Sequence, residues 1–436
     1  MTDFITHKPS GWDIKNLENV AKFITKGATP TTYGFKWVEE SSDSIPFLRS
    51  ECVTANGFNR KGMNFISKKA HMTMERSKIK SGDILMTITG NIGRIATLPD
   101  EIPEANINQH IAKISVIDGV SSSYVAQALQ QERYNRYYER ILTGQAYPQI
   151  SLKQVRETPI LLPPYPEQQK IAEVLSTVDK KIDLIDQKIA ETEKLKTGLM
   201  QKLFSEGVGI QDENGNWQPH TEFQDSIYGN IPKTWKLSKL NQVTDYVDYR
   251  GKTPPKVESG TFLVTAKNIK NGFIDYECSK EYIPLELYDD VMSRGKPKLG
   301  DVVFTTEAPL GNVALIDRSD VAIAQRVIKF RPKDDICLDS GYLKHFMLST
   351  YFQKELLQNA TGSTVLGVKG KRLHVMLVCL PSINEQKMIV DILNEIDRKK
   401  HFLELQKAET QQLKKGLMQK LLTGEWRVPV EVTEAA

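Results

Sequence analysis

An internal repeat is the feature that most constrains how this chain folds. Residues 163–204 and 381–422 align without a gap at a shift of 218, and 18 of the 42 aligned positions are identical. Both copies contain the run Gly-Leu-Met-Gln-Lys-Leu. The repeat continues at lower identity into the sequence before each copy, pairing Gly27 with Gly251, Asn56-Gly57-Phe58 with Asn271-Gly272-Phe273, Gly82-Asp83 with Gly300-Asp301, Gly93 with Gly311, Gln109 with Gln325, and Thr143-Gly144 with Thr361-Gly362. A duplication of this size predicts two copies of one architecture.

The two repeated segments have the pattern of long helices. Prolines precede Glu167, a carboxylate suited to a helix N-terminus, and apolar residues then recur at alternating spacings of three and four, as in a coiled-coil seam. About 37 residues at 1.5 Å each would span roughly 55 Å. The predicted seam consists of Ile171, Val174, Val178, Ile182, Ile185, Ile189 and Leu199 in the first copy, and Ile389, Ile392, Ile396 and Leu417 in the second.

An isolated helix of this kind would leave a long apolar stripe exposed. The simplest burial pairs the two copies, antiparallel and related by an approximate two-fold axis. Leu195 and Leu413 extend the seam, and Lys400 and Lys407 interrupt it. The alternative is that each helix packs on its own globular half.

The globular halves are predicted to be mixed α and β. Short β-like runs such as DILMTITG and IAKISVI, or DVVFTT and RVIKF, are separated by Gly, Asn and Pro, and one helix closes each half, near 124–142 and 342–359. A purely β module is the alternative. The predicted fold is therefore α+β: two mixed α/β domains joined by two long antiparallel helices. The domains are placed at 1–162 and 208–380 (with a linker at 208–230), the spacer helices at 163–207 and 381–425, and a tail at 426–436.

No motif supports catalysis or metal binding. Pro163-Pro164-Tyr165 resembles part of an amino-methyltransferase site, but Leu162 stands where that chemistry needs a polar acceptor, and the second copy reads Pro381-Ser382-Ile383. Gly251-Lys252-Thr253 lacks the first glycine of a phosphate-binding loop. The four cysteines are widely spaced and no His cluster accompanies them, so neither a zinc site nor a disulfide framework is indicated. We expect a non-catalytic chain with no metal of its own.

Basic and polar groups recur in both halves. Residues 60–80 carry seven Lys or Arg against one Glu, and Arg133, Arg136 and Arg140 alternate with tyrosines on one predicted helix. Such groups neutralise phosphates, and Arg, Lys, Asn and Gln on loops read base edges. Any one of these charges is more often a solvated surface residue, and a net charge of +4 decides nothing alone.

The first residues lack a signal-peptide pattern, and no window approaches 18 uninterrupted apolar residues. We therefore expect a cytoplasmic protein that does not span a membrane.

With the repeats laid out, the chain resembles the specificity (S) subunits of type I restriction-modification systems over nearly its full length. The resemblance rests on the Gly-x-Thr-Pro turns at Gly27 and Gly251, the Thr-Gly pairs at Thr143 and Thr361, the Pro...Glu-Gln segments at Pro163 and Pro381, and the Leu-Lys-x-Gly-Leu-Met-Gln-Lys-Leu endings. The first copy departs from it at Gly144-Gln145-Ala146, where the family has Gly-Ser-Thr.

The resemblance implies that each globular half is a target recognition domain that reads one half of a bipartite, asymmetric site on double-stranded DNA. It implies that the helices set the spacing and dock two methyltransferase subunits, to which endonuclease/translocase subunits are added. S-adenosylmethionine, ATP and Mg would then belong to those partners. A free-standing DNA binder, an enzyme in its own right and a scaffold without DNA affinity are the alternatives. The candidate DNA-binding residues are Lys26, Thr29, Lys68, Lys69, Gln109, Gln149, Lys252, Lys267, Gln325 and Lys371.

Overall fold

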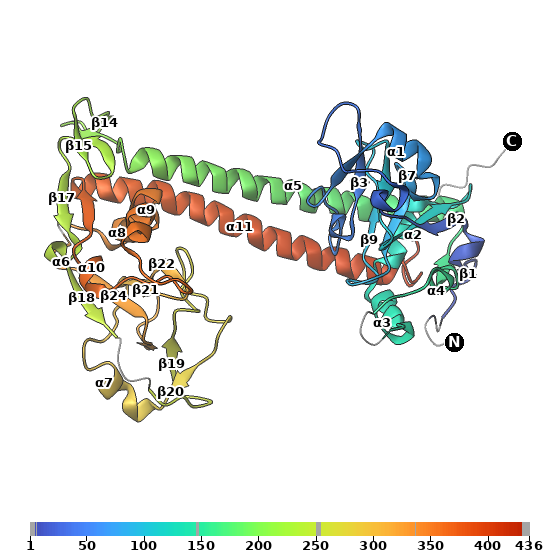
Figure 1. Cartoon of the computed structure of the whole chain (residues 1–436). Coiled ribbons are helices and arrows are strands. Elements are labelled where there is room, and N and C mark those ends of the chain that lie inside the picture. Colours follow the sequence, from blue (N-terminus) through green and yellow to red (C-terminus); the bar gives the residue numbers. More distant parts are fainter. Residues whose placement is uncertain (1–4, 6, 145–147, 250–253, 336, 430–436) are drawn as a thin grey trace. The chain divides into compact units, whose positions relative to one another are not determined.

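The computed structural model describes residues 5, 7–144, 148–249, 254–335 and 337–429 (Figure 1). The chain separates into two compact units. Unit 1 comprises residues 1–186 and 405–436, and unit 2 comprises residues 187–404. Each unit therefore holds one globular half, the adjoining half of one long helix and the opposite half of the other.

Unit 1 is built around two four-stranded sheets. One is antiparallel with the order β2-β11-β8-β9, and the other, ordered β6-β3-β10-β7, contains one parallel pair, β3 with β10. A short pair, β1 with β12, precedes the long helix, and β4 pairs with β5. The strands are β1 Asp13–Asn16, β2 Ala21–Lys26, β3 Ser44–Leu48, β4 Val53–Thr54, β5 Gly57–Phe58, β6 Asn64–Ser67, β7 Lys78–Lys80, β8 Ile84–Thr87, β9 Ile95–Thr97, β10 Glu104–Ile107, β11 Ile111–Val116 and β12 Pro159–Leu162. The α-helices are α1 Lys68–Thr73, α2 Ser122–Leu129, α3 Glu132–Ile141, α4 Leu152–Arg156 and α5 Tyr165–Leu203.

Unit 2 repeats this plan. Its antiparallel sheet is β18-β24-β21-β22, its second sheet β20-β19-β23 again has one parallel pair, β19 with β23, and β17 pairs with β25 before the second long helix. The hairpins β13-β14 and β15-β16 have no counterpart in the described part of unit 1. The strands are β13 Ile210–Gln211, β14 Trp217–Gln218, β15 Phe223–Ser226, β16 Gly229–Pro232, β17 Lys236–Lys239, β18 Thr244–Asp248, β19 Thr261–Val264, β20 Tyr282–Ile283, β21 Val302–Thr306, β22 Leu310–Leu315, β23 Val321–Ile323, β24 Val327–Pro332 and β25 Leu377–Leu380. The α-helices are α6 Leu240–Val243, α7 Tyr288–Val291, α8 Ser340–Leu348, α9 Thr350–Asn359, α10 Gly370–Leu373 and α11 Ile383–Leu421.

The mixed α and β prediction is confirmed, but the single closing helix predicted for each half is wrong. In unit 1 the segment breaks into α2 and α3, and in unit 2 into α8 and α9. The second break comes where Ser349 caps the next helix by accepting a hydrogen bond from the Phe352 amide. A residue that must stay extended to cap a new helix cannot continue the previous one.

The long helices α5 and α11 each contain 39 residues and form an antiparallel coiled coil. Four cross-helix ion pairs fix the register. In unit 1 Lys414 pairs with Asp179 and Lys407 with Asp186, each at 2.6 Å. In unit 2 the pairs are Lys400 with Glu193 at 2.6 Å and Lys196 with Asp397 at 2.5 Å. Lys400 and Lys407, which interrupt the apolar pattern, thus serve the pairing of the helices.

The predicted seam residues are buried or half-buried. Ile171 and Ile389 are fully buried, Ile185 is 4% exposed, and Val174, Val178, Ile182, Ile189, Leu199, Ile392, Ile396 and Leu417 are half-buried. Leu195 and Leu413 are exposed, so their placement in the seam was wrong. The buried positions at that level are Thr192 and Thr410. The hydroxyl of each donates to the carbonyl one turn earlier, on Lys188 and Gln406 respectively, and so the polar group is satisfied inside the helix.

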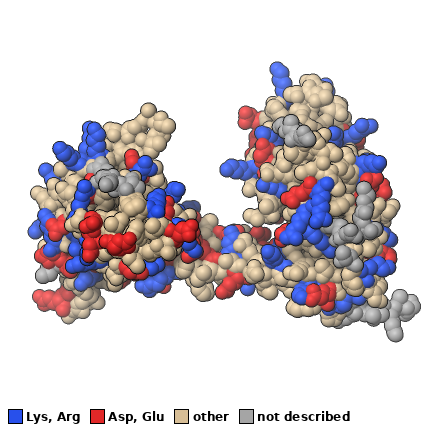
Figure 2. All heavy atoms as spheres, turned by 90° about the horizontal axis from the view of Figure 1, so that it is seen from below, with Lys and Arg blue, Asp and Glu red and all other residues tan. Residues whose placement is uncertain are grey.

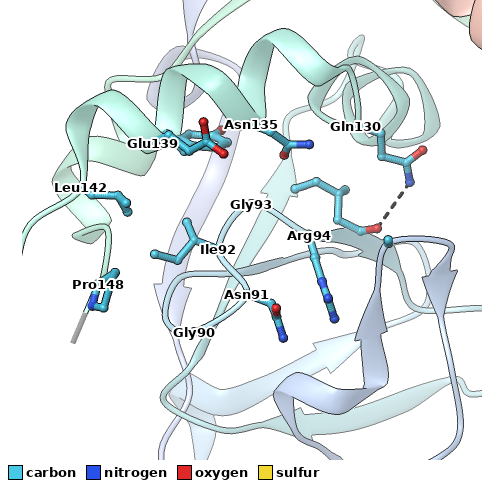
Figure 3. Close-up of a pocket in the computed structure, with 13 residues that line it drawn as sticks. Gly90, Asn91, Ile92, Gly93, Arg94, Gln130, Asn135, Glu139, Leu142 and Pro148 are labelled. Atoms are coloured by element: carbon cyan, nitrogen blue, oxygen red, sulfur yellow. Dashed lines mark hydrogen bonds between the residues drawn. The ribbon is translucent and has the colours of Figure 1, made fainter. Parts of the chain in front are cut away.

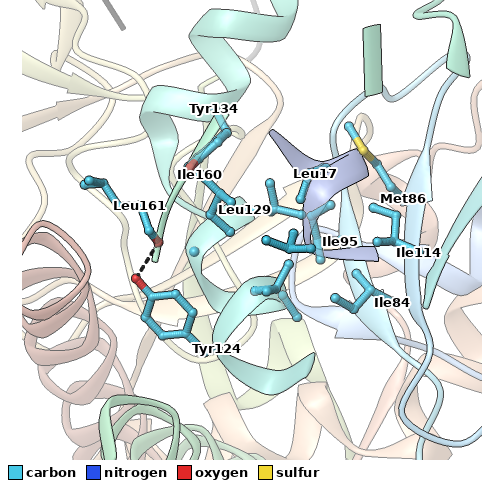
Figure 4. Close-up of a cluster of buried hydrophobic side chains, with 14 of the residues drawn as sticks. Leu17, Ile84, Met86, Ile95, Ile114, Tyr124, Leu129, Tyr134, Ile160 and Leu161 are labelled. Atoms are coloured by element: carbon cyan, nitrogen blue, oxygen red, sulfur yellow. Dashed lines mark hydrogen bonds between the residues drawn. The ribbon is translucent and has the colours of Figure 1, made fainter. Parts of the chain in front are cut away.

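The main hydrophobic core of each unit is completed by both helices. In unit 1 the sheet residues Ile84 and Ile114 lie close to the helical residue Leu129 (Figure 4). The same core contains Ile171 from the start of α5 and Leu422, just after α11. In unit 2 the corresponding core contains Ile389 from the start of α11, Leu203 from the end of α5, and Phe204. The helices therefore pack both on each other and on the globular halves.

A buried glutamate anchors the start of each long helix. Glu167 accepts hydrogen bonds from Trp12 Nε1 at 3.0 Å and from the guanidinium of Arg427 at 2.6 and 2.8 Å. Its counterpart Glu385 accepts from Trp235 Nε1 and from the amides of Val208 and Gly209, at 2.9 to 3.1 Å. Each glutamate thus ties a helix start to the segment that follows the end of the other helix.

Two further features, a membrane-spanning helix and a metal-binding group, are absent from the described residues. No helix among them is both long enough and apolar enough to cross a membrane. No group of three or more His, Cys, Asp or Glu side chains among them is placed to hold a metal ion.

Candidate nucleic-acid interface

Surface charge alone does not locate an interface. Figure 2 shows Lys and Arg over both units, interspersed with Asp and Glu. In the basic stretch 60–80, Lys68 pairs with Asp43 and Lys78 pairs with Glu75. The stretch is also divided among β6, α1 and β7. These lysines therefore do not form one continuous strip.

The tyrosines of α3 do not form a base-stacking surface. Tyr134 and Tyr138 are buried in the core of unit 1, and burial raises the pKa of Tyr134 to about 12. Tyr134 donates its hydroxyl to the Pro159 carbonyl. The predicted alternation of arginine and tyrosine on this helix is therefore an amphipathic pattern, with the aromatic side chains facing inward.

Three of the predicted residues come together in unit 1 at one end of the antiparallel sheet. Thr29 donates its hydroxyl to Gln109 Oε1 at 2.7 Å, and Gln109 Nε2 lies 3.1 Å from His110 Nε2. His110 Nδ1 lies 2.6 Å from the hydroxyl of Thr89. The tautomer of His110 with a proton on Nδ1 fits both contacts, because Nδ1–H can donate to Thr89 and Nε2 can accept from Gln109. Thr89 forms a β-bridge with Gln149, which in turn bridges to Thr143.

The Gly-x-Thr-Pro turn requires a glycine at position 27 because the turn passes very close to the backbone of this cluster. A Cβ added to Gly27 would lie 1.8 Å from the Ile107 carbonyl oxygen and 2.7 Å from that of Asn108. Any side chain at this position would push the turn away from the loop that carries Gln109, because atoms cannot approach so closely. Thr29 would then lose its contact with Gln109.

A cleft of about 490 Å³ adjoins this cluster. The loop from Gly90 to Arg94, which follows Thr89, lines one wall, and α3 lines the other with Asn135 and Glu139 (Figure 3). The hydroxyl of Thr87 accepts a hydrogen bond from the Arg94 amide, and this contact fixes the base of the loop. The cleft has both polar and apolar lining residues, and two of them, Gly90 and Pro148, directly adjoin Thr89 and Gln149 in the sequence.

The same frame recurs in unit 2 with different side chains. The Thr305 hydroxyl accepts from the Asn312 amide, as Thr87 does from Arg94. Glu307 and Thr361 both form β-bridges with Gly367, as Thr89 and Thr143 do with Gln149. At the position of the Thr89–His110 contact stands an ion pair, with Arg326 Nε 2.9 Å from Glu307 Oε1.

The other candidate residues are distributed as follows. Lys26 is exposed at the end of β2, close in sequence to Gly27, and Gln325 is half-buried beside Arg326. Lys371 is exposed on α10, shortly after Gly367. Lys68 and Lys69 begin α1, and Lys267 is exposed in the loop after β19; these three belong to other elements. Lys252, and with it the Gly251-Lys252-Thr253 segment, lies outside the described residues, as do Gln145 and Ala146.

Sequence reasoning missed Thr89, His110, Glu307 and Arg326. His110 and Arg326 directly follow the two glutamines that were chosen. The sequence signal for His110 and Arg326 was therefore the repeat pair Gln109 and Gln325. The prediction chose the glutamines and left out the residue that follows each of them. Thr89 and Glu307 carry no local signal, because only the folding of separate strands and loops brings them beside His110 and Arg326.

Comparison with known families decides the assignment. The sequence model described as the type I restriction modification DNA specificity domain matches twice, at residues 9–194 and 232–415. The chain belongs to this family.

Among specificity-family members, the chain is 27% identical over 428 residues to the type I restriction enzyme MjaVIII specificity subunit of Methanocaldococcus jannaschii, covering 96% of this chain and 94% of that protein. It is 23% identical over 393 residues to the EcoBI specificity subunit of Escherichia coli, covering 81% and 78%. The solved S subunit of a type I restriction-modification system from M. genitalium shares the fold, with a TM-score of 0.55, 14% identity and coverage of 97% and 99%. A chain from a structural study of type I complex assembly also aligns with a TM-score of 0.55, at 19% identity and coverage of 96% and 100%.

Proposed function

We propose that this chain is the DNA-reading specificity subunit of a type I restriction-modification complex. Each globular half reads one half of a bipartite, asymmetric site on double-stranded DNA. The antiparallel helices set the separation of the two readers and dock two methyltransferase subunits, and endonuclease/translocase subunits join for cleavage. The domain boundaries predicted from the sequence, at residues 163, 208 and 381, are retained as part of this proposal.

One observation supports the proposal above all others. The DNA specificity family matches twice, and the two copies share one loop frame that carries different polar side chains. Two readers with the same backbone and different donors and acceptors can recognise two different short sequences. A stiff spacer between them holds the two half-sites at a fixed distance.

The chemistry of the complex is assigned to its partners. We place the methyl donor S-adenosylmethionine, ATP and Mg in the partner subunits, and we assign no reaction step to this chain. A restriction-modification role also places the protein in the cytoplasm, where host DNA is methylated.

The proposal is tested by sequencing modified bases in a host that carries this gene and its neighbouring methyltransferase gene, and in a matched host that lacks only this gene. We expect a methylated two-part motif with a fixed gap to disappear when the gene is removed. Unchanged methylation, with the methyltransferase expressed, would contradict the proposal.

A further inference from the structure

The Thr89–His110 contact and the Glu307–Arg326 contact occupy one position in the repeated fold. In unit 1 the Ile88 amide donates to the His110 carbonyl, and the Ile150 amide to the Ile88 carbonyl, both at 3.0 Å. In unit 2 the Thr306 amide donates to the Arg326 carbonyl at 2.9 Å, and the Val368 amide to the Thr306 carbonyl at 3.0 Å. The backbone hydrogen bonds of this frame are therefore the same in both units, and the side chains that meet on it differ.

The backbone of Arg326 is strained. Its φ is +72°, a region that residues other than glycine rarely adopt. The Thr306 amide and hydroxyl both donate to the Arg326 carbonyl, at 2.9 and 3.1 Å, and hold the residue in this conformation. Strain of this kind persists where the surrounding structure fixes it, often at functional sites.

Stability does not account for this arrangement. The side chains of Arg326 and Glu307 are 52% and 44% exposed. Ion pairs this exposed are screened by solvent and contribute little to stability, so this pair does not offset the backbone strain. The carboxylate does orient the guanidinium through Nε, and the remaining N–H groups of an arginine can donate two parallel hydrogen bonds.

We propose that Arg326, oriented by Glu307, is a base-reading residue of the second recognition domain and contacts a guanine, and that the Gln109–His110 pair reads a base at the equivalent position of the first. Bidentate donation to guanine O6 and N7 is the contact for which an arginine at an exposed loop is best suited. In unit 1 the neutral chain of Thr29, Gln109, His110 and Thr89 offers both donors and acceptors, so it selects a different base. This inference rests on the proposed function and adds the residues that make the two half-sites differ.

The test uses the chain assembled with its own methyltransferase partner and a duplex library in which each base of the methylated motif is varied singly. In R326Q we expect discrimination at one position, a G·C pair of one half-site, to fall about tenfold or more, with the other half-site unchanged. In H110A we expect the change in the opposite half-site. Gln is as strained as Arg at this φ, so R326Q keeps the backbone requirement.

R318Q is the matched control. Arg318 is also an exposed arginine paired with a carboxylate, Asp320, at 2.7 Å, but it lies outside the loop frame. We expect the R318Q variant to recognise the same DNA motif as the wild type.

Three outcomes would overturn the inference. They are an unchanged motif in R326Q, a change in the same half-site for R326Q and H110A, and uniform weakening across all sequences with a smaller salt dependence, which marks a phosphate contact. In each of these the wild type still yields a two-part motif, so the proposed function stands. Absence of any two-part motif in the wild type removes the proposed function and this inference together.

Discussion

At His345 the two units, although built on one plan, differ in whether a buried side chain can titrate. It is fully buried on α8, and its Nε2 lies 2.9 Å from Asn394 Oδ1 on α11. Its buried Nδ1 has no hydrogen-bond partner among the described residues. Burial, and next the neighbouring charge of Lys344, lowers the pKa of His345 from 6.5 to about 3. In unit 1 the equivalent residue is Gln127, which donates to Ser176 on α5 and carries no titratable group.

Lowering the pH should therefore destabilise unit 2, because His345 binds a proton more readily in the unfolded state. Because the folded pKa lies below the unfolded one, the stabilising contribution is complete above pH 6.5. It falls as pH drops below that value, by up to about 1.4 kcal/mol per pH unit. Among the charged groups nearby, Lys344 and Lys196 oppose protonation, and Asp397 favours it. We expect the protection of α8 amides against hydrogen exchange, corrected for intrinsic rates, to fall between pH 6.5 and 4.5 in the wild type.

The matched variant is H345Q, which places in unit 2 the glutamine that unit 1 has at the equivalent position, Gln127. Its α8 exchange, corrected for intrinsic rates, should depend less on pH over this range. Equal pH dependence in H345Q and the wild type would show that another group is responsible.

At the scale of elements, the paired helices carry the same ion pair twice. Asp179 and Asp397 are equivalent residues of the repeat, as are Lys196 and Lys414. Lys414 meets Asp179 in unit 1, and Lys196 meets Asp397 in unit 2. Their side chains are 19–37% exposed, so these pairs are less screened by solvent than ordinary surface pairs. The repeated pair favours one antiparallel register, because a slip along the helices would separate every lysine from its carboxylate.

A double-mutant cycle on Asp179 and Lys414 measures this contribution. We expect D179N and K414M together to cost less than the sum of the single changes, with a coupling energy of about 0.5–1 kcal/mol. The comparison pair is Lys170 with Glu173, which lies on the surface of α5 alone. Its coupling should be about 0.3 kcal/mol. Zero coupling between Asp179 and Lys414 in unfolding experiments would refute a role in register.

At the scale of the whole molecule, unit 1 is not a continuous stretch of chain, because unit 2 is inserted between its two segments. The core of unit 1 includes Leu421 and Leu422, which follow the whole of unit 2 in sequence. Glu167 near the start of α5 binds Arg427, just beyond α11. Unit 1 is therefore completed only after nearly all of the chain has been made.

Truncating Leu422, which follows unit 2 in the sequence, should consequently destabilise unit 1. Leu422 is fully buried, so L422A should cost about 2–5 kcal/mol and speed hydrogen exchange in β11 and α2. Exchange in β21 and α8 of unit 2 should remain as in the wild type. L413A, at a position 54% exposed, should change neither. Equal loss of protection in both units of L422A would contradict separate cores.

Much of the architecture could be predicted from the sequence because it depends on one-dimensional pattern. The shift of 218 is visible as identity, and the seam from Ile171 to Ile189 is visible as period, since residues three or four apart share a helix face. Strands such as β8 and β21 were found for the same reason, as short apolar runs bounded by turn residues. Lys400 and Lys407 broke the apolar pattern, and their role became clear only with the facing carboxylates Glu193 and Asp186.

The sequence by itself determined the duplication, the two long helices, the mixed globular halves and the glutamines at 109 and 325. Only the tertiary structure decided which side chains meet those glutamines, and that Leu195 faces solvent while Thr192 is buried. The physical reason is that helices and strands follow from neighbours within a few residues. The polar cluster joins Thr29, Thr89, His110 and Gln149, whose contacts exist only once separate loops have been folded onto one end of a sheet.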